Sequence, residues 1–245
     1  MKLTTTDVKN LINTLNGIKE ITEEATFTAT KEGLKFEECD ESMVSLVNGI
    51  LKASGFEEYN YDNKEFTINL EQLIKILKCT TKEDKIKFET DFENNKLKIT
   101  MLSDIKQTFV IPLLNIEKSN TLPPIKELNF KSIVETKIKT IQKAIKNADI
   151  LNDWLIFEIR DKSLILSNED SVSKLEVLIN SEELIYNNKE EAKSRYTLEY
   201  LKKIFKTKTF CELVKISFGT DYPAKFEFVG DHIILNYILA PRIEE

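Results

Sequence analysis

The 245-residue sequence has little of the chemistry on which most enzymes depend. It contains one histidine, His232, and only six glycines, and no Gly-rich phosphate loop is present. No Ser/His/Asp arrangement and no cluster with metal-ligand spacing occurs. Asp40 and Glu41 form a carboxylate pair, for which we favour a structural or partner-contacting role in a loop. The sequence therefore argues against an enzyme, and we expect neither a metal nor another cofactor.

Long apolar segments are also absent. No run approaches the about 20 residues that a membrane-spanning helix needs, and the amino terminus shows no signal pattern. We therefore expect an intracellular protein that does not contact a membrane. The cysteines, Cys39, Cys79 and Cys211, are odd in number and far apart. This spacing argues against a disulfide framework, and we expect small buried side chains instead.

Arginine is scarce, and acidic residues outnumber basic ones. The formal net charge is −6, which by itself argues against nucleic-acid binding. Arginine occurs only at positions 160, 195 and 242, so the planar fork that reads guanine is almost missing. Lysine is abundant, and lysine charges can follow phosphates without reading bases. The placement of the lysines therefore matters more than the net charge.

A ten-residue stretch occurs twice, as NLEQLIKILK at 69–78 and TLEYLKKIFK at 197–206. Each copy opens with a residue suited to capping a helix, Asn69 or Thr197. The apolar residues that follow recur at i, i+3, i+4 and i+7, which is one stripe of an α-helix. The lysines of each copy point away from that stripe. Both copies continue into an alternating strand, at 85–88 and at 215–218.

Two earlier helices correspond as well, at about 7–20 and 137–148. Val8, Leu11 and Leu15 form the stripe of the first, and three isoleucines at 138, 141 and 145 form that of the second. The sequence therefore consists of two copies of one unit. Three of the four helices carry lysines on one face, which makes these the candidate phosphate-contacting residues: Lys75, Lys78, Lys139, Lys143, Lys146, Lys203 and Lys206. Lys9 and Lys19 of the first helix are weaker candidates, and Asn13 and Asn16 make that helix less basic.

Many short alternating segments separate these helices, which is typical of an α+β fold with antiparallel sheet. One predicted strand spans 43–51, and a polar loop is predicted at 187–193. Residues 112–128 contain three of the five prolines, which favours an extended, semi-rigid connector. We therefore expect an amino-terminal domain at 1–111, the connector at 112–128, and a carboxy-terminal domain at 129–245.

Four stretches carry a family resemblance: DESMVSLV at 40–47, GFEEY at 55–59, KILKC at 75–79 and LAPRIE at 239–244. Together with the internal repeat, they resemble PCNA, the DNA sliding clamp family of archaea and eukaryotes. The resemblance covers the whole chain in the same order. The sequence stops just after Leu-Ala-Pro-Arg-Ile, without the acidic tail of many eukaryotic members, which favours the archaeal type. An archaeal clamp would be cytoplasmic and associated with the nucleoid, and a eukaryotic one nuclear.

The resemblance implies a trimeric ring whose inner wall is made of helices and whose outer wall is sheet. The seven candidate lysines would then face duplex DNA without sequence preference. Neighbouring chains would join through edge strands at 104–111 and 171–179. The implied partners are DNA polymerase, the clamp loader, flap endonuclease and DNA ligase, which dock through PIP-type peptides. Because the clamp loader hydrolyses the ATP, the resemblance implies no nucleotide cofactor on this chain.

The resemblance also implies a hydrophobic groove for client peptides beneath the connector. Carried over by position, its residues are Met43, Val44, Leu46, Leu122, Pro124, Pro223, Ile238, Leu239, Ala240 and Pro241. For Leu46 and Ile238, packing in the core is the strong alternative. Two other functions stay open at this point. The first is a subunit of a heterotrimeric or checkpoint-type clamp, and the second is a peptide-binding scaffold that makes no direct contact with DNA.

Overall fold

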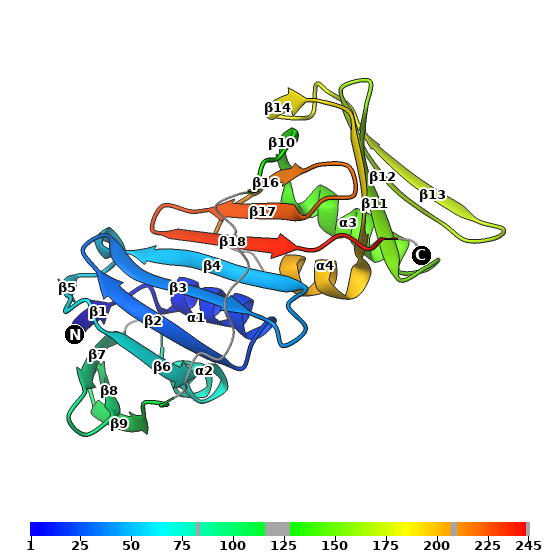
Figure 1. Ribbon diagram of the computed structural model, residues 1–245. Helices are drawn as coiled ribbons and strands as arrows, with labels where there is room; N and C mark the ends of the chain where they lie inside the picture. Colours follow the sequence, from blue (N-terminus) through cyan, green and yellow to red (C-terminus); the bar gives the residue numbers. More distant parts are fainter. Residues whose placement is uncertain (82–83, 116–127, 207–209, 244–245) are drawn as a thin grey trace. The chain divides into compact units, whose positions relative to one another are not determined.

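The computed structural model describes residues 1–81, 84–115, 128–206 and 210–243, with the side chains of 186–189 left out. The chain divides into two compact units (Figure 1). Unit 1 comprises Met1–Cys39, Val47–Leu122 and Gly230–Leu235, and unit 2 comprises Asp40–Leu46, Pro123–Val229 and Asn236–Glu245. Each unit therefore takes in a short segment from the other half of the sequence. The boundaries at 111/112 and 128/129 stay a prediction.

The first half of the chain forms helices and strands in the following order: β1 (Lys2–Thr5), α1 (Val8–Lys19), β2 (Glu24–Thr30), β3 (Gly33–Cys39), β4 (Ser45–Lys52), η1 (Ala53–Gly55), β5 (Glu58–Asn60), β6 (Glu65–Asn69), α2 (Leu70–Leu77), β7 (Lys85–Asp91), β8 (Lys96–Leu102) and β9 (Lys106–Pro112). Strands β5-β1-β7-β8-β9 are hydrogen-bonded in that order, and β4-β3-β2-β6 form a second series. Helices α1 and α2 pack against each other.

The second half repeats this sequence of elements: β10 (Ser132–Lys137), α3 (Ile138–Ala148), β11 (Trp154–Arg160), β12 (Ser163–Glu169), β13 (Lys174–Ile179), β14 (Tyr186–Lys189), β15 (Ala192–Thr197), α4 (Leu198–Phe205), β16 (Leu213–Phe218), β17 (Ala224–Val229) and β18 (Ile233–Leu239). Strands β14-β10-β16-β17-β18 match the first series of the amino-terminal half, and β13-β12-β11-β15 match the second. Helix α3 packs against α4, as α1 does against α2. The topology thus confirms the α+β class and the internal repeat.

The repeated helices α2 and α4 each begin directly after a strand and bury the predicted stripe. In α2 the side chains of Leu70, Leu73, Ile74 and Leu77 are all at most 4% exposed. The first helical amides find equivalent partners in the two copies, because Leu70 N donates to Glu23 O at 3.0 Å and Leu198 N to Asp153 O at 2.8 Å. The two ten-residue stretches therefore occupy the same structural position.

The two predicted caps behave differently. Asn69 Oδ1 accepts a hydrogen bond from Gln72 N at 2.9 Å, so this cap is confirmed. Thr197 holds the N-cap position of α4, but its side chain makes no capping hydrogen bond, so that prediction was wrong. The backbone junction, which both copies share, therefore starts α4 without a side-chain cap.

Three further sequence predictions need correction. The strand predicted from residue 43 begins at Ser45, because Met43 has a φ of 55° and lies in a turn. The polar loop predicted at 187–193 overlaps strand β14, which pairs with β10, and the start of β15. Cys79 is exposed, and Cys39 and Cys211 are half-buried, so the cysteines are not the buried residues we expected. Strand β14 was not predicted because its residues are mostly polar and do not alternate between apolar and polar types.

Aromatic rings tie α4 to the strands of its own unit. Phe205 of α4 makes edge-to-face contacts with Phe226 at 5.4 Å and Phe228 at 5.6 Å between ring centroids. Phe226 in turn contacts Phe157 at 6.1 Å, and Phe157 contacts Tyr196 at 5.5 Å. Each buried aromatic side chain stabilises the fold by roughly 1.5–3 kcal/mol. The cluster fixes which face of α4 points into the core, and therefore which face carries its lysines.

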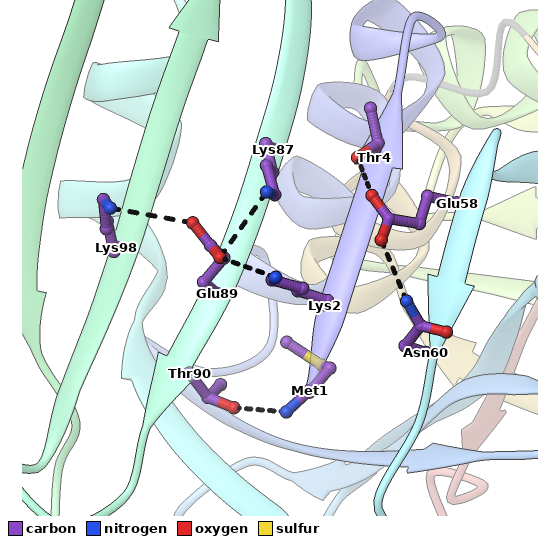
Figure 2. Close-up of polar contacts among 9 residues, drawn as sticks. All are labelled: Met1, Lys2, Thr4, Glu58, Asn60, Lys87, Glu89, Thr90 and Lys98. Atoms are coloured by element: carbon purple, nitrogen blue, oxygen red, sulfur yellow. Dashed lines mark hydrogen bonds and ion pairs between the residues drawn. The ribbon is translucent and has the colours of Figure 1, made fainter.

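On the strands β1, β7 and β8, one carboxylate lies among three lysines (Figure 2). Glu89 lies 3.5 Å from Lys2, 3.5 Å from Lys87 and 3.7 Å from Lys98. Partial burial raises the pKa of Glu89, but the ammonium groups of Lys87, Lys98 and Lys2 outweigh it and the pKa is lowered. Such exposed pairs contribute little stability individually. Glu89 thus partly compensates the positive charge of the three lysines around it.

The caps give a matched pair of substitutions. Asn69→Ala should destabilise the protein by about 1 kcal/mol, because it removes the acceptor for an otherwise free helix amide. Thr197→Ala should reduce the stability by only a few tenths of the amount expected for Asn69→Ala, because no capping hydrogen bond is lost. Thermal denaturation followed by circular dichroism measures both, and equal losses would contradict the assignment.

Candidate functional site

Helix α3 presents an exposed lysine face without any acidic residue. Its sequence, IKTIQKAIKNA, buries Ile138, Ile141, Ala144, Ile145 and Ala148. Lys139, Lys143 and Lys146 are exposed on the other side. Among the described residues, no ion pair is found for any of the three. The amphipathic pattern thus places three uncompensated ammonium groups on one surface of unit 2.

Helices α2 and α4 carry lysines that are held by acids of the same repeat. Lys75 Nζ lies 2.7 Å from Glu71, and Lys203 Nζ lies 2.7 Å from Glu199, both at i,i+4 spacing. The hydrogen bond from Lys75, together with the charge of Lys19 3.6 Å away, lowers the pKa of Glu71. The ion pairs of these two acids with the lysines were not predicted from the sequence. The signal was present, because Glu71 and Glu199 recur at the same position of the repeat.

The remaining lysines of these helices lie near their carboxyl ends. Lys78 and Lys206 hold the C-cap positions of α2 and α4 and are exposed. A cation at a helix C-terminus is favourable because the last carbonyl groups carry partial negative charge. Lys202 of α4, which we did not predict, forms a close ion pair with Asp149 at the end of α3.

Helix α1 is less basic, as its sequence predicted. Asn16 Nδ2 donates to Ile12 O at 2.8 Å, so this side chain is engaged by its own helix. Lys9 is exposed, whereas Lys19 forms an ion pair with Glu71 of α2. The strongest concentration of free positive charge on the described helices therefore lies on α3.

The predicted groove residues separate into a buried and an accessible set. Leu46 and Leu239 are 3% and 0% exposed, so both pack in the core, and Ile238 is 9% exposed. Met43 is 43% exposed. The half-buried residues are Val44, Pro223, Ala240 and Pro241. Leu122 and Pro124 lie outside the described residues. Ala240 N donates to Val44 O at 2.9 Å, which brings the two accessible segments together within unit 2.

The loop that carries Met43 and Val44 is held by Asp40. The Asp40 carboxylate accepts from Ser45 N at 2.6 Å through Oδ1 and from the Tyr200 hydroxyl at 2.7 Å through Oδ2. Burial, followed by the hydrogen bond and charge of Asp40, raises the pKa of Tyr200 to about 12. Asp40 thus has the structural role that we favoured, and a residue of α4 positions the loop.

Two further findings on the described residues concern metal sites and membrane-spanning helices. No group of three or more His, Cys, Asp or Glu side chains among them could hold a metal ion. None of the helices in these ranges has the length and apolar character needed to cross a bilayer.

Comparison with known proteins decides the family. The family described as "Proliferating cell nuclear antigen, N-terminal domain" matches residues 2–119. The DNA polymerase sliding clamp of Nanoarchaeum equitans is 32% identical over 249 residues, covering 99% of both chains. The chain belongs to the PCNA family of DNA polymerase sliding clamps. The clamp of Methanococcus maripaludis strain C7 is 31% identical, covering 98% of both chains.

Solved structures of sliding clamps match the whole fold. The PCNA2–PCNA3 complex from Sulfolobus tokodaii contains a chain with a TM-score of 0.88 and 27% identity, covering 100% of both chains. PCNA of A. fulgidus, bound to the C-terminal region of FEN-1, gives a TM-score of 0.88 and 26% identity, with 100% and 99% coverage. The repeated units are therefore those of the DNA clamp fold.

Two strands of this clamp are terminal in their series and carry exposed apolar residues. Strand β9 ends the series β5-β1-β7-β8-β9, and β13 begins β13-β12-β11-β15. Val110 of β9 is 55% exposed, and Leu178 of β13 is 53% exposed. The strand edges at 104–111 and 171–179 therefore combine unpaired backbone groups with exposed apolar side chains, as an association surface requires.

Removing the Tyr200 hydroxyl should loosen the loop that contains Met43. Tyr200→Phe should make the backbone amides of 41–44 exchange faster, because Asp40 loses its partner on α4. The substitution should also make the folding stability decrease less as the pH rises into the alkaline range. The pKa of Tyr200 is about 12 in the folded state and the ordinary tyrosine pKa is 10.0, so Tyr200 contributes stability below pH 10 that is lost between pH 10 and about 12. Hydrogen exchange and the pH dependence of the melting temperature measure the two effects.

Proposed function

We propose that three copies of this chain close head-to-tail into a ring around duplex DNA and tether replication and repair proteins to it. The chain itself catalyses no reaction, and it acts on the nucleoid of an archaeal cell. Membership of the sliding clamp family supports this proposal, as does the named function of the archaeal relatives. The observation that carries it is the acid-free lysine face of α3, opposite a face buried in the core.

Encirclement reconciles DNA binding with a net charge of −6. A closed ring holds DNA by topology, so the lysines need only weak, exchangeable phosphate contacts. We assign these contacts to Lys75, Lys78, Lys139, Lys143, Lys146, Lys203 and Lys206. Lysine suits this role because its ammonium is a flexible point charge without the fixed fork of arginine. Salt links to Glu71 and Glu199 weaken the contacts of α2 and α4, so α3 contributes most.

Client proteins dock in the groove formed by the accessible residues of unit 2 around the Asp40 loop and the Ala240-Pro241 segment. The similarity to a PCNA that binds the C-terminal region of FEN-1 supports a flap endonuclease as one client. DNA polymerase, DNA ligase and the clamp loader are the others. A short peptide with an aliphatic and aromatic plug fits a hydrophobic groove of this kind.

Neutralising the α3 lysines should weaken DNA binding more than neutralising those of α2. Lys139→Gln/Lys143→Gln/Lys146→Gln should lower polymerase processivity and reduce the slope of log K against log salt by roughly 2–3, since each phosphate contact contributes about 0.9. Lys75→Gln/Lys78→Gln should reduce the slope by less than 1.8, because Glu71 already competes for Lys75. Glu71→Gln should strengthen binding.

The control removes the same charge elsewhere. Lys31, Lys96 and Lys131 are exposed and lie outside the helices, so their replacement by Gln should leave the salt slope almost unchanged. Fluorescence anisotropy on a circular or end-blocked duplex loaded with the clamp measures both sets. A peptide-binding scaffold without DNA contact predicts no difference between the triple variants, and that result would overturn the proposal.

Ring closure is tested through the apolar edge residues. Val110→Asp or Leu178→Asp should convert a particle of three chains into monomers, because each places a charge at the proposed contact between β9 and β13 of neighbouring copies. Val229→Asp is the matched control, since Val229 is 57% exposed but belongs to β17, which is an inner strand between β16 and β18. Light scattering after size exclusion gives the masses.

A heteromeric clamp is the second candidate, because the PCNA2–PCNA3 complex is among the similar structures. In that case the wild-type chain alone stays monomeric or dimeric over a dilution series, and a mass of three chains appears only with its paralogues. A stable homotrimer excludes this alternative.

A further inference from the structure

Unit 2 contains a polar cavity that the proposed function does not use. Its volume is about 320 Å³, and its walls come from β11, β15, the β16–β17 turn and the carboxy-terminal segment. The charged residues that line it are Lys193, Arg195, Asp221 and Arg242. Three cationic side chains therefore face one carboxylate in a protein whose overall charge is −6.

Arginine is concentrated here. Only Arg160, Arg195 and Arg242 occur in the whole sequence, and two of these three line this cavity. The guanidinium of Arg195 lies over the Trp154 ring at 4.2 Å from its centroid, which fixes its plane. Arg242 N donates to Arg195 O at 2.7 Å, so the carboxy-terminal segment is attached to β15 at this point. A planar, oriented guanidinium is suited to binding a carboxylate through two hydrogen bonds.

The ion pair between Arg242 and Asp153 is open to solvent. Arg242 contacts Asp153 at 2.8 Å, but these side chains are 42% and 66% exposed, so the pair is solvated and weak. Asp221 is exposed as well. A carboxylate from outside can therefore replace Asp153 at Arg242 and also reach Lys193 at small cost.

The cavity adjoins the accessible groove residues along the chain. Arg242 directly follows Ala240-Pro241, and Asp221 lies two residues before Pro223. It lies on the sheet face opposite the core: Arg195 pairs with Ile156, whereas the next residue, Tyr196, is fully buried against Phe157. The core face is the side on which the rings of α4 pack. The cavity therefore neighbours the groove residues along the chain and lies on the sheet face away from Phe205 of α4.

We propose that this cavity binds the carboxylate groups of acidic residues that flank the groove-binding motif of client peptides. The proposal rests on the proposed function, because it needs a peptide in the groove. It adds a specificity determinant: clients with an acidic flank bind more tightly than clients with a neutral one, through Arg195, Arg242 and Lys193. Duplex DNA is the competing anion, and the test includes it.

The test compares labelled synthetic peptides based on the C-terminal region of FEN-1 that is bound to A. fulgidus PCNA. In one form two glutamates flank the groove-binding motif, on either its amino or its carboxyl side, and in the other form two glutamines replace them. Fluorescence anisotropy with the trimeric full-length protein gives the affinities. The glutamate form should bind roughly 3- to 10-fold more tightly on one of the two sides, an advantage that high salt removes.

Three variants locate the effect. Arg242→Gln and Lys193→Gln should each remove most of the advantage of glutamate over glutamine while leaving the affinity of the glutamine peptide unchanged. Arg160→Gln is the control, because Arg160 is the third arginine, is exposed, and pairs with Glu158 on β11. Trp154 is the sole tryptophan, so its fluorescence should change with the glutamate peptide and stay constant with the glutamine peptide.

The outcomes separate the two proposals. If neither peptide binds, the groove itself is absent and the proposed function fails at its client site. If both bind equally, or if Arg160→Gln has the same effect as Arg242→Gln, the groove stands and the carboxylate site is refuted. A loss of duplex binding by Arg242→Gln and Lys193→Gln, with the peptides unaffected, assigns the cavity to DNA and also overturns the proposal.

Discussion

The structure depends on burial of a narrow apolar stripe by helices of only two turns. Helices α2 and α4 have eight residues each, and helices of this length are not stable alone in water. They form because Leu70, Leu73, Ile74 and Leu77, and their equivalents in α4, are removed from water against their own unit. The lysine face is thus a consequence of core packing. A substitution in the stripe would disorder the charged surface before it changed any charge.

The acids of the repeat shape how these lysines act. At i,i+4, Glu71 and Glu199 stabilise short helices, which have little other support. The same acids draw Lys75 and Lys203 away from external phosphates. Helix α3 has eleven residues, and its lysines form no ion pair with any residue that the structure describes. The two eight-residue helices therefore hold part of their positive charge in ion pairs, whereas α3 presents its charge without one.

The sequence predicted the features that follow from periodicity and repetition. The stripe, the strand that follows each repeated helix, the Asn69 cap and the α+β class all depend on local pattern. Prediction from the sequence failed for features that depend on tertiary contacts. Thr197 was expected to cap because of its residue type, but the contact of Leu198 N with Asp153 O already starts the helix. Strand β14 is polar and exists because β10 offers it an edge.

The candidate sites were predictable to different degrees. The lysine positions follow from helical spacing, and their exposure agrees with it. The groove came from a family resemblance, which fixes position along the chain but not burial, so Leu46 and Leu239 entered the list although they pack in the core. The arginine cavity is formed by β11, β15 and the carboxy-terminal segment, which are far apart in sequence. No local sequence pattern predicts this cavity. The one related signal in the sequence is the scarcity of arginine, because two of the three arginines line it.

Helix α4 contacts both the proposed DNA-binding face and the loop that carries Met43, which are far apart in the sequence. Lys203 lies with its ammonium 5.0 Å from the centre of the Tyr200 ring, and the hydroxyl of Tyr200 holds Asp40. One side chain thus contacts both a lysine of the proposed DNA-binding face and the loop that carries Met43. Because the core fixes α4 through Phe205, this link is built on a rigid element. A displacement of Lys203 by phosphate would act on the Tyr200 ring, and the loop position would change only if the Asp40 hydrogen bond also broke. The geometry therefore favours a groove whose shape is independent of DNA, as a platform that must accept clients at every position along the duplex requires.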